Sequence, residues 1–182
     1  IQVETSNNPI YSGSYAPAIA EVLASELTGL TTFNKKITLG VPNIRGIAID
    51  PATNAPAPNT WVDIYDQTNN KWMGGSNTDL NGLFALNASA TNATYSLNLN
   101  PAWNSSSISA RHSYTVTVGA NATDVNIKDD LSGATIISDA TTKLFTLSLA
   151  TPSVIGSVKD PANANGIANS WVQAFNLSLI HI

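Results

Sequence analysis

The sequence predicts an all-β fold of the sandwich type, and three observations support this prediction. Apolar and polar residues alternate with a period of two along short segments such as Tyr95–Leu99 and Tyr114–Val118. Turn-forming Asn, Asp, Gly and Pro separate these segments. Charged residues make up only 11% of the 182 residues and hydrophobic residues 43%, so Asn, Ser and Thr supply the polarity, which favours strands over amphipathic helices.

Composition also argues against several classes of site and partner. The chain has no cysteine, which removes disulfides, thiolate metal sites and cysteine nucleophiles. A net charge of -4, with no basic cluster beyond Lys35-Lys36, argues against binding to nucleic acid or to an anionic membrane surface. No stretch reaches the roughly 20 apolar residues of a membrane span, so we expect no direct membrane insertion.

An internal repeat sets the domain organisation. Residues 31–66 align without a gap on residues 141–176, at an offset of 110. Many matched positions are apolar or turn-forming, and the identical pairs include Gly46/Gly156, Asp50/Asp160, Pro51/Pro161, Trp61/Trp171 and Val62/Val172. Because such positions shape a fold, we interpret the chain as tandem repeats of one domain.

The repeat divides the chain into one complete unit flanked by partial units. The complete unit spans residues 42–151, after the C-terminal part of a preceding unit in residues 1–41 and before the start of the next in residues 152–176. Residues 177–182 resemble the conceptual translation of a transposon-end adapter used in DNA library preparation. We interpret that hexapeptide as a sequence artefact.

The complete unit is expected to hold roughly eight strands, in the order of its alternating segments. The first covers Ile44–Ile49, and a loop of turn-forming residues follows over Asp50–Asn59. Thr78–Gly82 is expected to turn tightly, with Gly82 at a positive φ, and Ala16–Leu27 is the one helical pattern. Later strands are expected at Trp61–Tyr65, Lys71–Met73, Leu83–Leu86, Tyr95–Leu99, Tyr114–Val118, Val125–Ile127, Thr135–Ile137 and Leu144–Leu149.

Four motifs of the complete unit resemble the carboxypeptidase regulatory-like domain family. In that family a Gly-x-Val-x-Asp opening, an Ala-x-Val strand, a Thr-Asp-x-x-Gly-x-Phe turn and a Tyr-x-Leu-x-Val strand recur in this order. The first copy has Ala48 where the family has Val, whereas the second copy fits the opening fully with Gly156, Val158 and Asp160. The matching segments here are Ile44–Asp50, Asn59–Ile64, Thr78–Leu86 and Tyr95–Leu99.

The resemblance covers residues 42–103 and is shared in part by collagen-adhesin B-type repeats. It implies an Ig-like or prealbumin-like Greek-key sandwich that serves as a spacer, stability or ligand-contact module in secreted proteins. It implies no catalytic residues to carry over. The stretch from Asn104 to about Ser138 is longer than the short form of the family.

No pattern in the sequence predicts an enzyme, a metal site or a cofactor. His112, beside Arg111, is expected at the surface or at a strand edge. The complete unit has no Glu and its Asp residues lie along turns, so paired carboxylates for acid–base catalysis have no support. Asp79–Gly82 lacks the further oxygen ligands and the closing Glu of a calcium loop, so a hairpin turn is the better interpretation.

Two kinds of site stay open as alternatives. An adventitious calcium site between repeats has as candidate ligands Asp124, Asp129 and Asp130. Collagen-adhesin relatives form Lys–Asn isopeptide crosslinks, for which no buried acid can be assigned here, and the amines available are Lys71, Lys128 and Lys143.

Aromatic and asparagine side chains are the candidates for surface contacts. Trp72 and Trp103, near turns or strand ends, are candidates for ligand contact. Trp61 and Trp171, at matching repeat positions among apolar neighbours, are expected in the core. The N-glycosylation pattern is matched at Asn87, Asn92, Asn104 and Asn121.

The predicted function is that of a non-catalytic extracellular or cell-surface module, a structural spacer or adhesive stalk. Its partners are expected to be neighbouring repeats of the same chain, with a carbohydrate or a surface protein as further candidates. The alternative is an accessory, carbohydrate-binding module of a larger secreted hydrolase, with the catalytic domain elsewhere in the gene.

Overall fold

The computed structural model describes residues 2–3, 16, 18–19, 22–29, 35–88, 91–102, 108–167, 170 and 172. The chain divides into two compact units, Ile1–Thr151 and Pro152–Ile182, and each is described by itself. Residues 177–182, interpreted above as an artefact, lie outside the described residues.

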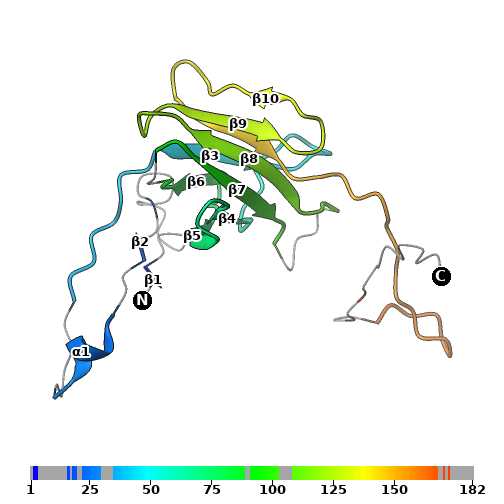
Figure 1. Cartoon of the computed structure of the whole chain (residues 1–182). Coiled ribbons are helices and arrows are strands. Elements are labelled where there is room, and N and C mark those ends of the chain that lie inside the picture. The colour runs from blue at the N-terminus through cyan, green and yellow to red at the C-terminus, as the bar shows by residue number, and fades with distance from the viewer. Residues whose placement is uncertain are drawn as a thin grey trace, which may run out of the picture. The chain divides into compact units, whose positions relative to one another are not determined.

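The first unit consists mostly of strands, so the predicted all-β class is confirmed. One sheet has the strand order β10-β9-β8-β7-β4-β5 and a second has the order β11-β3-β6. In Figure 1 the strands β9, β8 and β7 lie side by side, with β3 and β6 in a second layer. The bounds are β3 Ile44–Ile49, β4 Trp61–Asp66, β5 Lys71–Asn77, β6 Leu83–Leu86, β7 Ala93–Asn100, β8 His112–Val118, β9 Val125–Asp129, β10 Thr135–Ile136 and β11 Phe145–Ser148.

The core takes the inward positions of both sheets. Alternation decides which these are, since β4 buries Val62 and Ile64 while Trp61 and Asp63 stay half-buried. Fully burying a side chain of this size stabilises the fold by about 1.5–3 kcal/mol. The largest fully buried side chains are Tyr95, Tyr114, Phe84, Ile44, Ile64, Leu86, Leu97, Leu99, Ile127, Leu147, Val62 and Val116.

The first and last strands of this sandwich, β3 and β11, are parallel neighbours. They pair from Phe145↔Gly46 to Ser148↔Ile49. The pairing continues beyond β11, where Leu149 N–H donates to Ile49 O at 3.0 Å. Because parallel strands run the same way, the chain enters at the start of β3 and leaves at the other end of the sandwich, after β11 (Figure 1).

Gly46 allows β6, β3 and β11 to meet closely. It pairs with Phe84 in β6 and with Phe145 in β11. A Cβ at this position would lie 2.5 Å from Phe84 Cζ and 2.6 Å from the backbone oxygen of Phe145. Gly46, from the opening motif, and Phe84, from the turn motif, therefore pack directly against each other.

Side-chain hydrogen bonds fix the Thr78–Gly82 turn. Thr78 Oγ1 donates to Ala57 O at 2.7 Å, and Asp79 Oδ1 accepts from Asn81 N–H and from Leu83 N–H, at the start of β6, at 2.8 Å each. Gly82 has a φ of 72°, and a Cβ there would lie 2.5 Å from Ala48 O. The tight turn and the positive φ are thus confirmed.

One loop conformation recurs along the chain. Its first residue is an Asp whose Oδ1 accepts from backbone N–H groups two or three residues ahead, and its fifth residue has a positive φ. In the described residues such loops begin at Asp50, Asp66, Asp129, Asp139 and Asp160. The fifth residues are Asn54, Asn70, Gly133, Lys143 and Ala164. Asn and Gly tolerate this backbone conformation, whereas Lys and Ala carry a steric penalty in it.

The expected helix over Ala16–Leu27 is wrong for its first part. Ala16 forms an isolated bridge with Gly40, and Ala18–Ile19 is strand β2, paired with β1 (Gln2–Val3). Among the described residues, the helix is reduced to α1, Ala24–Leu27. A single turn is marginal in water without tertiary packing, and α1 buries none of its residues, so the apolar periodicity of this segment is a weak signal.

Replacing Gly46 with Ala is expected to lower the free energy of unfolding by about 1–3 kcal/mol, because the added methyl group overpacks the contact with Phe84. Chemical denaturation followed by tryptophan fluorescence measures the loss. Phe84→Leu should make room for the added methyl group. The double variant should therefore lose less free energy of unfolding than the two single variants lose in sum. Strictly additive losses would contradict this contact.

Replacing Lys143 with Asn is expected to raise stability by up to about 1 kcal/mol, because Asn adopts a positive φ more readily than Lys. Lys128→Asn makes the same change of charge within β9, where Asn is disfavoured, and should leave stability unchanged or lower it. Thermal unfolding of the two variants compares them directly. Equal shifts in both would show that charge, not backbone conformation, is responsible.

Candidate functional site

Polar side chains form a row across the outward face of the six-stranded sheet. Asp63 in β4, Asn98 in β7 and Ser113 in β8 are direct cross-strand neighbours. Strand alternation separates them from the inward, fully buried Val62 and Ile64. The row therefore lies on the face turned away from the three-stranded sheet.

Asn98 is the centre of this row. Its Oδ1 accepts from Arg111 Nη2 at 2.7 Å and from Ser113 Oγ at 2.9 Å, and its Nδ2 donates to Asp63 Oδ1 at 2.9 Å. Asn100 Nδ2 donates to the other Asp63 oxygen at 3.1 Å. We call these five residues the Asn98 network. Asn98 is only 6% exposed although it lies on the outward face, so its partners hold the amide in one orientation.

Trp61 borders the Asn98 network on β4. It was expected in the core, and this prediction is wrong, because the inward positions of β4 belong to Val62 and Ile64. A Cβ on Gly75 would lie 2.7 Å from Trp61 Cζ2, so the indole ring occupies the space that a side chain on Gly75 would need. Trp61 is thus half-buried on the outward face.

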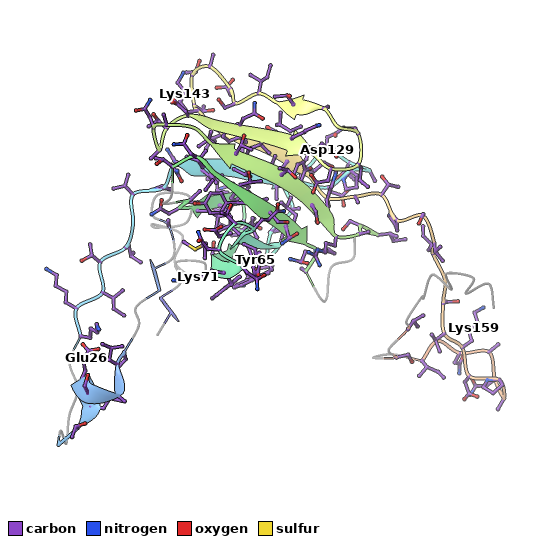
Figure 2. All side chains as sticks on the ribbon, in the orientation of Figure 1. Glu26, Tyr65, Lys71, Asp129, Lys143 and Lys159 are labelled. Atoms are coloured by element: carbon purple, nitrogen blue, oxygen red, sulfur yellow. The ribbon has the colours of Figure 1, made fainter. Side chains whose placement is uncertain are left out.

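Trp72, expected to contact a ligand, lies on β5 opposite Tyr65 and is 38% exposed. Figure 2 labels Tyr65 close to Lys71, at the β4–β5 turn. Trp103, the other candidate for ligand contact, and Trp171 lie outside the described residues. The structure therefore places Trp61, half-buried, on the outward face of the sheet that carries the exposed Trp72, and leaves a ligand for Trp72 as a prediction.

His112 is the centre of a second cluster, which links the two sheets. Its Nδ1 lies 2.8 Å from Ser148 O in β11, and its Nε2 lies 3.0 Å from Asp129 Oδ1 in β9. Tyr114 stacks on the imidazole at 4.4 Å between ring centroids and donates from its hydroxyl to Ser148 O at 2.7 Å. The Tyr114 hydroxyl also lies 3.2 Å from His112 Nδ1, so both ring nitrogens have a polar partner.

The expectation that His112 lies at the surface or at a strand edge is wrong. Its side chain is 7% exposed, and β8 is flanked by β7 and β9. The alternation along β8 already indicates that His112 is buried, since it is in phase with the buried Tyr114 and Val116. The cluster links β8 to β9 and to β11 on the inward side of the larger sheet. Such an arrangement is typical of a structural hydrogen-bond network.

Burial and hydrogen bonding shift the pKa values of two members of this cluster. Burial raises the pKa of Tyr114. Burial also acts to raise the pKa of Asp129, but hydrogen bonds from Ser132 N–H, His112 and Leu131 N–H outweigh it and lower that pKa. Asp129 is therefore held as the carboxylate that accepts from the imidazole.

The remaining candidate residues are spread over the surface. Asn92 and Asn121 are exposed, and Asn87 is half-buried, while Asn104 lies outside the described residues. Glycosylation at these positions stays a prediction. The three lysines considered for a crosslink are all exposed, so none of them is shielded from water in the core, and these are Lys71, Lys128 and Lys143.

The aspartates considered for calcium are each engaged with a different partner. Asp124 accepts from Asn121 Nδ2 at 2.8 Å, and Asp130 accepts from Thr115 Oγ1 at 2.7 Å, while Asp129 pairs with His112. Over the described ranges, no group of three or more His, Cys, Asp or Glu side chains is placed to hold a metal ion.

Comparison with known proteins gives no relative. No model of a known protein family matches the chain, and neither the curated proteins nor the solved structures give a match. In the part of the chain that the structure describes, no helix has the length and hydropathy needed to cross a membrane.

Replacing Asp129 with Asn is expected to lower the free energy of unfolding by about 1–3 kcal/mol near pH 6, because a partly buried charged hydrogen bond is lost. The pKa of Asp129 is lower in the folded chain, so its contribution is present above the unfolded value of about 3.9 and is lost as the pH falls through the folded value. The difference between wild type and variant should therefore shrink between about pH 5 and pH 2.

Denaturant unfolding at a series of pH values tests this expectation. Asp130→Asn is the matched control, since it removes the same charge one residue away and leaves the His112 contact in place. A difference for Asp129→Asn that stays constant from pH 6 to the acid limit would contradict the role of the carboxylate.

Proposed function

We propose that this chain is part of a non-catalytic spacer, in which sandwich units resembling carboxypeptidase regulatory-like domains follow one another head to tail. The observation that carries the proposal is the parallel pairing of β3 with β11. Entry and exit of the chain therefore lie at opposite ends of these strands, which rise about 3.3 Å per residue. Each added unit then extends the chain instead of folding it back.

Local conformations that recur at the repeat offset support the tandem arrangement. Asn54 N–H donates to Asp50 O at 2.9 Å, and 110 residues later Ala164 N–H donates to Asp160 O at 2.8 Å. The closing bond recurs as well, since Ala57 N–H donates to Ala48 O and Ile167 N–H donates to Val158 O, at 2.8 and 2.9 Å. These bonds support the sequence repeat with matching backbone geometry in both copies.

A further pair of bridges supports assigning residues 1–41 to a preceding unit. Ala150 forms an isolated bridge with Ala110 at the end of the complete repeat. Gly40, its equivalent at the offset of 110, forms an isolated bridge with Ala16. Gly40 and Ala150 thus each form an antiparallel bridge just before the start of the following unit.

The proposed setting is the outside of a cell, where such units hold another domain away from the surface. The partners are the neighbouring repeats of the same chain. The link between units is short, because Ala150 is still tied to Ala110 by hydrogen bonds of 3.0 and 2.7 Å and Thr151 directly precedes Pro152. A stiff connection follows from so few free backbone torsions.

Small-angle X-ray scattering on one copy and on two joined copies of residues 42–151 tests the spacer. The maximum dimension is expected to about double on joining, since units add end to end. Inserting a flexible Gly/Ser linker after Thr151 serves as control and should broaden the distance distribution. A two-copy protein little longer than one copy would mean side-by-side packing and would overturn the proposal.

A further inference from the structure

We propose that the outward face of the six-stranded sheet binds a neutral polysaccharide, with Trp61 and the Asp63 and Arg111 side chains of the Asn98 network as the contact residues. The site goes beyond the spacer function and uses residues of β4 and β7 together with Arg111 and Ser113, at the start of β8. Trp61 and Asn100 are direct cross-strand neighbours, as are Asp63 and Asn98, so the aromatic ring lies next to the polar row.

The hydrogen-bonding capacity of the Asn98 network exceeds what its own contacts use. A carboxylate offers about four acceptor sites. The Asp63 oxygens accept one amide N–H each within the network. A guanidinium has five N–H donors, and Arg111 gives one of them to Asn98. Asp63 and Arg111 thus keep acceptors and donors that are held in place by Asn98 and can pair with the hydroxyl groups of a sugar.

Charge on this face favours a neutral ligand over an ionic one. Asp63 and Arg111 both bond to Asn98, so their opposite charges lie in one network. In the next row, Lys128 pairs with Thr115, whose hydroxyl donates to Asp130 at 2.7 Å, which again brings one positive and one negative group together. A nucleic acid or an anionic surface requires a basic excess that these rows lack.

Trp61 supplies the apolar half of the contact. The face of an indole carries negative charge density, which suits the C–H groups on the flat side of a pyranose ring. Gly75 leaves the space that the indole occupies beside Asp63. An aromatic ring next to fixed polar groups on an open sheet face suits an extended chain of sugars more than a small molecule, which needs a deep pocket.

The experiment is native affinity electrophoresis of the full chain in gels containing hydroxyethylcellulose, laminarin, mannan or arabinoxylan. Retardation is expected in at least one of these gels. Trp61→Ala and Asp63→Ala should each weaken the association constant about tenfold or more, which corresponds to about 1.4 kcal/mol. Trp61→Phe, which keeps a ring, should retain part of the binding.

Thr117→Ala is the matched control, because it changes an exposed residue of β8 on the same face, away from the network, and should bind within about twofold of wild type. Asp63→Asn, which preserves shape, replaces Asp63→Ala if the latter fails to fold by circular dichroism. Absence of retardation in all four gels, or equal weakening by Thr117→Ala, overturns the proposal. Sedimentation that shows self-association lost in Asp63→Ala, without glycan binding, would instead make this face a protein interface.

Discussion

The close approach of three strands at Gly46 is the constraint on which the sandwich depends. β3 is the central strand of the smaller sheet, and Gly46 meets a phenylalanine on each side. Phe84 and Phe145 also belong to the core against which the larger sheet packs. Since protein interiors are close-packed, a side chain at position 46 would displace both neighbouring strands and, with them, the layer that covers the larger sheet.

Local chemistry explains why most of the fold was predictable. Alternation and turn residues located an expected strand at each of β3 to β11, although β5 continues to Asn77, beyond the expected Lys71–Met73. The Asp-initiated loops and the Gly82 turn depend on side chains that act within a few residues of themselves. The helix expected at Ala16–Leu27 failed because a short apolar periodicity does not by itself decide between a helix and a strand.

The candidate site was only partly predictable. Trp61 was assigned to the core and His112 to the surface, although alternation sets Trp61 apart from the apolar Val62 and Ile64 and puts His112 in phase with Tyr114 and Val116. The Asn98 network joins residues 35 and 13 positions apart along the chain, which only the strand order β4-β7-β8 brings together. Such contacts depend on topology, which a single sequence specifies only through the whole fold.

The parallel ladder between β3 and β11 has a mechanical consequence. Tension between the two ends of the unit draws β3 and β11 in opposite directions along their common axis. The hydrogen bonds of the Phe145–Ser148 and Gly46–Ile49 segments lie across that direction. They are therefore loaded in shear and all together, instead of opening one after another like a zipper. The force that the unit withstands is then determined by this short ladder, while the larger sheet carries little of the load.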